Sequence, residues 1–334
     1  MQHAFRINLV SELLKKIVPQ MGATLLLEPE YEYAGMIRFA SGKQMLFRGT
    51  CLNINPAGAV DIAKDKDYSK FFLRSFGYIV PEGKTFFSEE RNRVIRVQRD
   101  IYEGLVYAKK LGFPVVIKPN NSSQGNLVMK VYSEEEYMRG ASEIFLKYPV
   151  MLVEKWQEGR DFRIVVLDDR VISAYERVPF HVEGDGVGTI RELVGERLAH
   201  FEKTGRGALL DPRDGRVEQV IKREGYTWDS VLPQGVSLSL LDNANLSTGG
   251  TSVDYTTQIH PEVVNLAIAI TRDMGLRLCG VDVMLVDITK PLSSYCILEV
   301  NAAPGLDNYA RMGDEQMKRV EDLYLEVLRA IEQG

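Results

Sequence analysis

Three side chains with oxygen donors stand on two short apolar segments late in the chain. Asp282 lies within the segment 280–284, and Glu299 and Asn301 lie within 297–301. Side chains alternate across a strand, so Glu299 and Asn301 face the same way, and an antiparallel neighbour in register brings Asp282 to them. Hard oxygen donors suit Mg²⁺, whereas the lack of histidine and cysteine among them disfavours zinc. Each residue alone is typical of a surface strand end, but a buried acidic pair without a cation is costly, so together they predict a metal site.

Two lysines and a polar loop form a second group. Lys118 ends the apolar segment 114–119 and precedes the loop 120–125, while Lys66 lies on a predicted charged helix. Ammonium groups can neutralise a triphosphate, and the amides of such a loop can wrap phosphate. The loop lacks the GxxxxGK(S/T) spacing of a Walker A loop, so an ordinary solvated turn is an equal alternative. The candidate phosphate-binding residues of this group are Lys66, Lys118, Ser122, Ser123 and Gly125.

A third group could contact a nucleotide base and its sugar. The chain leaves an apolar strand beside an indole ring, where main-chain groups could hold adenine, and a carboxylate one turn onward could accept ribose hydroxyls. The residues are Glu154, Lys155, Trp156 and Asp161. Without further context, Trp156 is more typical of core packing than of a base platform.

The loop 245–251 is a fourth candidate, because its backbone amides and hydroxyls could hold an acyl phosphate or a substrate carboxylate. A hairpin loop without a ligand is an equal alternative. The candidate residues here are Arg177, from a predicted strand, with Asn245, Gly249 and Gly250.

Periodicity and turn residues predict the elements that must position these groups. Capping boxes at Ser133 with Glu136 and at Thr189 with Glu192 mark two helix starts. The predicted helices are 9–18, a charged helix from Asn55-Pro56 to about Gly77, 101–111, 261–274 and 314–331. The predicted strands are a buried 23–27, a hairpin of 36–39 and 44–47, then 114–119, 127–131, 150–154, 162–167, 171–177, and 278–286 antiparallel to 295–300. The segment 205–235 is predicted to be rich in loops, with one helix.

Length and composition bound the class of protein. A chain of 334 residues with 45% hydrophobic and 26% charged residues predicts a globular protein of two or three subdomains. The formal charge of -5, with dispersed lysines and arginines, argues against a nucleic-acid partner. No apolar stretch reaches the roughly 20 residues of a membrane span and no signal peptide is evident, which predicts a cytoplasmic protein without a membrane partner. The cysteines, Cys51, Cys279 and Cys296, lack a CxxC pair and are expected to be reduced.

The order of these groups resembles the ATP-grasp superfamily of carboxylate-amine ligases over most of the chain. By resemblance to D-alanine:D-alanine ligase, the segment 65–81 introduces a first ATP lysine, Lys66, and Lys118 is the second, followed by a loop that closes over the phosphates. The same resemblance implies adenine binding at 154–156 and ribose binding at Asp161. It implies magnesium binding at Asp282, Glu299 and Asn301.

Three further strings, 178–182, 184–193 and 245–251, resemble the ATP-grasp part of cyanophycin synthetase and of bifunctional glutathione synthetases. The extra ligase domains of both enzymes are missing, so a stand-alone relative is expected. One departure is Gly280, where D-alanine:D-alanine ligase has an arginine, and Arg177 or Lys222 would have to supply that charge.

The resemblance implies an α/β (α+β) ATP-grasp fold with an N-terminal domain at 1–98, a central subdomain at 99–158 and a C-terminal subdomain at 159–334, the last two enclosing ATP. It also implies an ATP-dependent ligase that forms an amide through an acyl phosphate from small carboxylate and amine substrates, amino acids or short peptides. One or two Mg²⁺ ions, or Mn²⁺ as a substitute, would assist, and a homo-oligomer is allowed. A thioester-forming enzyme, a kinase and a non-catalytic nucleotide-binding module are the alternatives.

Overall fold

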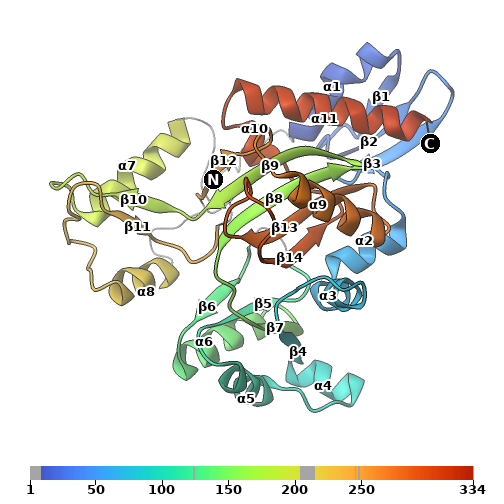
Figure 1. Cartoon of the computed structure of the whole chain (residues 1–334). Coiled ribbons are helices and arrows are strands. Elements are labelled where there is room, and N and C mark those ends of the chain that lie inside the picture. The colour runs from blue at the N-terminus through green and yellow to red at the C-terminus, as the bar shows by residue number, and fades with distance from the viewer. Residues whose placement is uncertain (1–8, 123–124, 204–214, 245, 247–248, 334) are drawn as a thin grey trace.

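The computed structural model describes residues 9–122, 125–203, 215–244, 246 and 249–333, and strands within these ranges form four sheets (Figure 1). A three-stranded sheet contains β1 (Thr24–Leu27), β2 (Ala34–Arg38) and β3 (Gln44–Arg48). A four-stranded sheet contains β4 (Gly83–Phe87), β7 (Val150–Lys155), β5 (Val115–Pro119) and β6 (Met129–Val131), in that order. The central five-stranded sheet contains β12 (Thr251–Asp254), β9 (Arg170–Val178), β8 (Arg160–Leu167), β13 (Leu278–Leu285) and β14 (Tyr295–Asn301). A small pair joins β10 (His181–Glu183) and β11 (Ser237–Ser239).

Helices cover these sheets and connect them. The five-stranded sheet lies between the β1–β3 sheet with α1 and α11 above, and the β4–β7 sheet with α5 and α6 below (Figure 1). The helices are α1 (Leu9–Ile17), α2 (Ala57–Lys64), α3 (Lys66–Ser75), α4 (Glu89–Ile95), α5 (Ile101–Leu111), α6 (Glu134–Phe145), α7 (Ile190–Lys203), α8 (Gly215–Arg223), α9 (Pro261–Asp273), α10 (Asp307–Ala310) and α11 (Asp314–Gln333), with a 3₁₀ turn η1 (Pro19–Met21). This mixed architecture confirms the predicted fold class. No helix in the described ranges is both long and apolar enough to cross a membrane.

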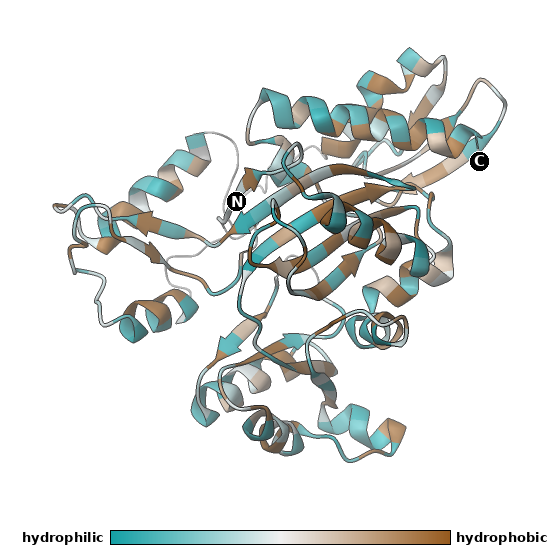
Figure 2. Ribbon diagram, viewed as in Figure 1, coloured by the Kyte–Doolittle hydropathy of each residue, from teal (hydrophilic) through white to brown (hydrophobic). Residues whose placement is uncertain are grey.

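Alternation along β8 gives the five-stranded sheet two different faces. Phe162 and Ile164 belong to a core that includes buried residues of α9, whereas Val165 and Leu167 belong to the core shared with α1 and α11. Apolar residues therefore line both faces of most of the sheet, while the side of α11 turned away from it is largely hydrophilic (Figure 2). The face of the sheet that carries Val165 and Leu167 becomes polar toward the start of β8.

Most predicted elements are present. The hairpin β2–β3 and the antiparallel pair β13–β14 confirm their predictions. Helix α5 begins after Asp100, whose carboxylate accepts from two backbone amides, and ends at Gly112, where φ is 82°. Both capping boxes form, since the hydroxyls of Ser133 and Thr189 accept from the amides of Glu136 and Glu192. These ends could be predicted because the signal is local.

Two predictions about the first hundred residues are wrong. The charged helix after Asn55 is two helices, because the Asp65 carboxylate accepts from the amides of Asp67 and Tyr68 and starts α3 afresh. The strand 23–27 is not buried, since it forms an edge of its sheet and Leu26 is 63% exposed. Local hydrophobicity cannot tell an edge strand from a central one.

The domain boundary predicted after residue 98 divides the four-stranded sheet. Strand β4 falls within the predicted domain 1–98, but it pairs with β7 of the next sheet. We therefore propose that the central subdomain begins before Gly83 rather than at residue 99.

Between β9 and β12 the chain leaves the five-stranded sheet and forms an insertion. This insertion has its own small core, which includes Phe180, Val182 and Leu232. It contains α7, α8 and the β10–β11 pair. The helix predicted within 205–235 corresponds to α8.

Asn55 ties the N-terminal segment to the five-stranded sheet. Its side-chain amide donates 2.7 Å bonds to the carbonyls of Leu278 and Ala302, and its oxygen accepts from the amides of Arg277 and Leu278. A buried amide with all these bonds made fixes both the start of β13 and the loop after β14.

We expect Asn55→Ala to lower the free energy of unfolding by about 3 kcal/mol, because it leaves several buried backbone groups unpaired. Urea denaturation measures this loss. Asn53→Gly is the control, since Asn53 is exposed with a φ of 54° that glycine adopts readily. Equal stability of Asn55→Ala and the wild-type chain would contradict the role of this amide.

Candidate functional site

A row of polar residues crosses the five-stranded sheet on the face that Val165 shares. Strand pairing sets Asp282 directly between Arg163 on β8 and Glu299 on β14. Arg163 in turn faces Tyr175 on β9. The alternation that predicted a common face for Glu299, Asn301 and Asp282 is therefore matched by the observed register.

Two arginines hold Asp282. The guanidinium of Arg163 makes two 2.7 Å bonds to its two carboxylate oxygens, and Nη1 of Arg177 lies 3.1 Å from Oδ2. Burial alone would raise the pKa of Asp282, but the two guanidinium groups more than offset it and hold the pKa below its usual value. The expectation that a bound cation must balance this buried acid is thus corrected, because the chain's own arginines already do so.

Asp161 extends the same network. Arg177 donates to both oxygens of Asp161, at 2.7 and 2.9 Å, so one guanidinium bridges two carboxylates. Burial raises the pKa of Asp161 despite the attraction of Arg177. The carboxylate predicted to bind ribose is therefore engaged by an arginine in this structure.

Glu299 and Asn301 complete the predicted oxygen set. With the Asn301 amide in the orientation that its neighbours favour, its nitrogen donates to Oε1 of Glu299 at 2.8 Å and its oxygen accepts from Nη2 of Arg163 at 3.2 Å. The Glu299 side chain is 28% exposed and its Oε2 lies 3.9 Å from Nζ of Lys66. Two carboxylates and an amide on one face suit a hard cation such as Mg²⁺. In the described part of the chain, no group of three or more histidine, cysteine, aspartate or glutamate side chains is placed to hold a metal.

Gly280 stands where the resemblance led us to expect an arginine, and packing explains why no larger side chain lies there. A Cβ on Gly280 would lie 3.0 Å from Cβ of Pro304, so the loop after β14 leaves little room for a side chain. Arg163 on the neighbouring strand and Arg177 both bring positive charge to Asp282, two residues after Gly280. Lys222, the other candidate, pairs with Glu218 on the exposed side of α8.

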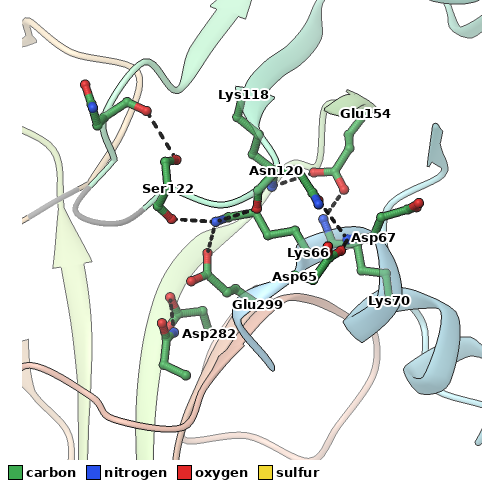
Figure 3. A network of polar contacts seen from close by, with 12 residues as sticks. Asp65, Lys66, Asp67, Lys70, Lys118, Asn120, Ser122, Glu154, Asp282 and Glu299 are labelled. Atoms are coloured by element: carbon green, nitrogen blue, oxygen red, sulfur yellow. Dashed lines mark hydrogen bonds and ion pairs between the residues drawn. The ribbon is translucent and has the colours of Figure 1, made fainter. Parts of the chain in front are cut away.

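Helix α3 brings lysines to the opposite side of the site (Figure 3). Nζ of Lys66 donates to the carbonyl of Ser122 at 2.7 Å and to that of Asn120 at 3.4 Å, in the loop after β5. Burial lowers the pKa of Lys66, while Glu299 opposes the shift. Lys66 thus links the loop after Lys118 to the carboxylate end of the five-stranded sheet.

Glu154 is shared by two lysines. Its Oε2 lies 2.6 Å from Nζ of Lys118, and its Oε1 accepts from Nζ of Lys70. All three side chains are buried. Burial lowers the pKa of Lys70 to about 7, whereas the attraction of Glu154 raises the pKa of Lys118 above its usual value. Burial would raise the pKa of Glu154, but its two lysine partners hold it below the usual value.

A cavity of about 450 Å³ opens beside Trp156. Val116 and Lys130 line it from the sheet, and Arg223 lines it from α8. The Lys130 ammonium lies 3.9 Å from the centre of the indole ring, so Trp156 is not simply core packing. Lys155 is exposed at the end of β7. A cavity of this size with an aromatic wall suits a planar base.

The remaining predicted residues belong to the loop after β5 and to the segment before β12. Ser122 contacts Lys66 through its carbonyl, and Gly125 has a φ of 67°. Gly249 also has a positive φ, 96°, and packs so closely on Phe180 that a Cβ would lie 2.7 Å from its ring. Gly250 is buried and precedes β12, where Ser252 pairs with Arg177. Ser123 and Asn245 lie outside the described residues.

Sequence reasoning missed Arg163 and did not assign Lys70. A signal existed for both. Arg163 lies two residues from Asp161 on a strand that is apolar from Ile164 onward, and this spacing places both on one face. Lys70 lies four residues after Lys66, on the same face of a helix.

Comparison with known families agrees with this geometry. A model of the RimK-like ATP-grasp domain matches residues 242–320, and a model of the D-ala D-ala ligase C-terminus matches residues 74–184. The two matches contain Lys118, Glu154 and the Asp282–Glu299 pair. The chain belongs to the ATP-grasp superfamily.

This ATP-grasp chain is 37% identical over 255 residues to a cyanophycin synthetase of Trichormus variabilis, covering 74% of the chain and 27% of that protein. It is 32% identical over 254 residues to the glutathione biosynthesis bifunctional protein GshAB of Mannheimia succiniciproducens, covering 73% of the chain and 32% of that protein. The chain thus spans about a third or less of these relatives. A bifunctional glutathione synthetase structure from Pasteurella multocida shares its fold, with a TM-score of 0.61 and 23% identity over 96% of the chain and 44% of that structure.

The burial of Lys70 predicts a pH effect on stability. Lys70 has a folded pKa of about 7 against an ordinary value of 10.5, so above pH 7 the unfolded chain binds more protons and stability rises with pH. We expect the free energy of unfolding of the wild-type chain, relative to Lys70→Met, to rise from pH 7 to pH 9. Cysteines ordinarily begin to titrate in this window, but both chains carry them, so their effect cancels in the difference. Denaturant titrations across this window measure the difference, and a constant difference would show that Lys70 stays protonated in the folded chain.

Proposed function

We propose that this ATP-grasp chain is an ATP-dependent carboxylate-amine ligase that forms an amide bond through an acyl phosphate and releases ADP and phosphate. The observation that carries the proposal is the two-sided charge layout of the site. Lys66 and Lys118 lie on one side and the oxygen donors Asp282 and Glu299 lie on the other (Figure 3). Asn301 follows Glu299 by two residues on β14 and is the third oxygen donor. A polyphosphate with a divalent cation is the ligand whose charges match both sides.

The residues present fit such a ligand. Mg²⁺ held by the three oxygen donors would neutralise phosphate charge, with one or two ions, or Mn²⁺, as the expected complement. Lys66 and Lys118 would bind phosphate oxygens, helped by backbone amides of the loop that includes Ser122 and Gly125. The base would enter the cavity beside Trp156 and contact the main chain of 154–156.

Asp161 has a conditional place in this proposal. Its carboxylate would accept ribose hydroxyls only when Arg177 moves from it, because the guanidinium now occupies both oxygens. A freed Arg177 would in turn be available to the substrate carboxylate or the acyl phosphate. Nucleotide binding and the release of Arg177 would then occur together.

The proposed reaction has two steps. A substrate carboxylate oxygen attacks the γ-phosphorus of ATP, and ADP leaves while Lys118 stabilises the developing charge. An amine then attacks the acyl carbon and phosphate leaves, with Arg177 and the backbone around Gly249 and Gly250 stabilising the oxyanion. The loop after Lys118 would exclude water, since an acyl phosphate hydrolyses readily.

The substrates follow from the relatives. Cyanophycin synthetase and the glutathione biosynthesis protein carry product names that point to amino acids and peptides, so we propose an amino acid or short peptide for each substrate. A cytoplasmic location, a pairing of identical chains and the absence of nucleic-acid and membrane partners belong to the same proposal.

One observation favours a second candidate. Because Arg163 and Arg177 already neutralise Asp282, a nucleotide-binding module without catalysis would need no metal to be stable. A thioester-forming enzyme or a kinase would use the same ATP site and differ only in the acceptor.

The acyl phosphate gives the most direct test of the reaction. With ATP, Mg²⁺, hydroxylamine and a panel of amino acids and short peptides, we expect ADP release and a hydroxamate of one acid. Mass spectrometry with the paired amine should show loss of one water in the joined product. ADP release without a hydroxamate would favour a kinase, and no ADP across the panel would favour the non-catalytic module.

Glu299→Gln tests the oxygen set. This variant keeps the shape of a partly exposed side chain but removes its charge, so we expect at least about a hundredfold loss of ligation with little change in thermal stability. Asp282→Ala is a poorer choice, because it leaves two buried arginines without their partner. The control is Glu315→Gln, at an exposed site on α11. Full activity of Glu299→Gln would remove Glu299 from the metal site.

A further inference from the structure

Lys70 is a buried lysine that the proposed ligand contacts do not require. It lies on α3 one turn after Lys66, and its side chain is 3% exposed. It does not reach the loop carbonyls that Lys66 contacts. Instead its ammonium donates to Glu154 in the four-stranded sheet. A lysine buried so deeply loses much of its hydration, and this loss is a free-energy cost that the contact with Glu154 must offset.

The side chain of Glu154 is held in one position by the strands on either side of it. Glu154 pairs with Gly83 of β4 on one side and with Val116 of β5 on the other. A Cβ on Gly83 would lie 2.7 Å from Cγ of Glu154, so only glycine leaves room for this rotamer. Lys118 lies two residues beyond Val116 on the same face, in the diagonal position across the two strands. Glu154 can therefore hold Lys118 and Lys70 at the same time.

While Lys70 is protonated, the charges of this cluster do not balance within the chain. Two lysines share one carboxylate, and Lys66 nearby has only the more distant Glu299, at 3.9 Å. Besides Glu154 and these lysines, the buried thiol of Cys296 on β14 also faces Lys70. A cluster with surplus positive charge is suited to an anion such as a nucleotide phosphate.

We propose that Lys70 is a positioning residue for the nucleotide site, which acts through Glu154 to fix the ammonium of Lys118 toward the phosphates. The inference rests on the proposed function, because it assumes that Lys118 binds ATP. Without Lys70, one oxygen of Glu154 loses its partner and the carboxylate can take both contacts from Lys118, which draws that ammonium toward β7. With Lys70 present, Lys118 keeps a single contact and its other protons point to the ligand.

A purely structural ion triad is the competing explanation, and the two make opposite predictions. Lys70→Met leaves Lys118 and Glu154 as a balanced pair, so we expect its melting temperature to match or exceed that of the wild-type chain. Its affinity for MgADP should nevertheless fall by about tenfold, the effect expected when one charge-assisted hydrogen bond is weakened. A structural role would instead lower the melting temperature and leave the affinity unchanged.

The test is a double-mutant cycle on the full chain, with MgADP binding measured by calorimetry for the wild type, Lys70→Met, Lys118→Met and the double variant. If Lys70 acts through Lys118, the double variant binds no more weakly than Lys118→Met alone. Glu154→Gln should reproduce the loss of affinity seen in Lys70→Met, which provides a second variant. Lys64→Met, at an exposed lysine of α2, is the matched control and should bind like the wild type.

The outcomes separate the two proposals. Wild-type affinity in Lys70→Met, or independent losses that multiply in the double variant, would overturn the positioning role while leaving the ligase proposal intact. Failure of the wild-type chain itself to bind MgADP would overturn the proposed function, and the positioning role with it.

Discussion

The register that sets Asp282 between Arg163 and Glu299 is the constraint on which the site depends. A carboxylate buried in the middle of a sheet is stable only when a cation faces it, and cross-strand pairing brings that cation to a fixed position. The same register sets Glu299 at the edge of the network, where Lys66 approaches from α3. A slip of one residue would move every one of these groups to the apolar face.

Several residues that take no part in the chemistry hold the site in place. Asn55 fixes the start of β13 and the loop after β14 with one side chain. Gly280 lets Pro304 fold back against the sheet, and Gly83 lets Glu154 turn toward its lysines. Each is a position where a larger or less polar side chain would displace a strand, so the fold of the N-terminal half and the geometry of the site are linked.

Sequence reasoning reached the elements whose signals are local and the residues whose spacing is regular. Strand alternation placed Glu299 and Asn301 together, and capping boxes gave the starts of α6 and α7. It did not reach Arg163, because its partner depends on which strand lies beside β13, and that pairing is set by tertiary packing. The break at Asp65 was missed because two successive helices can show the same spacing of apolar residues as one continuous helix.

The site also shows how charge is distributed between two layers. The four-stranded sheet and α3 contribute lysines, whereas the five-stranded sheet contributes carboxylates that are partly neutralised by its own arginines. The account thus predicts a change of partners when a metal-bound nucleotide arrives, with Asp282 exchanging an arginine for the metal. Such an exchange keeps every buried charge paired throughout.

A crystal structure of the chain with MgADP tests this claim most directly. The account predicts a magnesium ion within bonding distance of Asp282, Glu299 and Asn301, phosphates against Lys66 and Lys118, and Arg163 or Arg177 withdrawn from Asp282. Phosphates bound elsewhere, with Asp282 still held by both arginines and no metal beside it, would contradict the account.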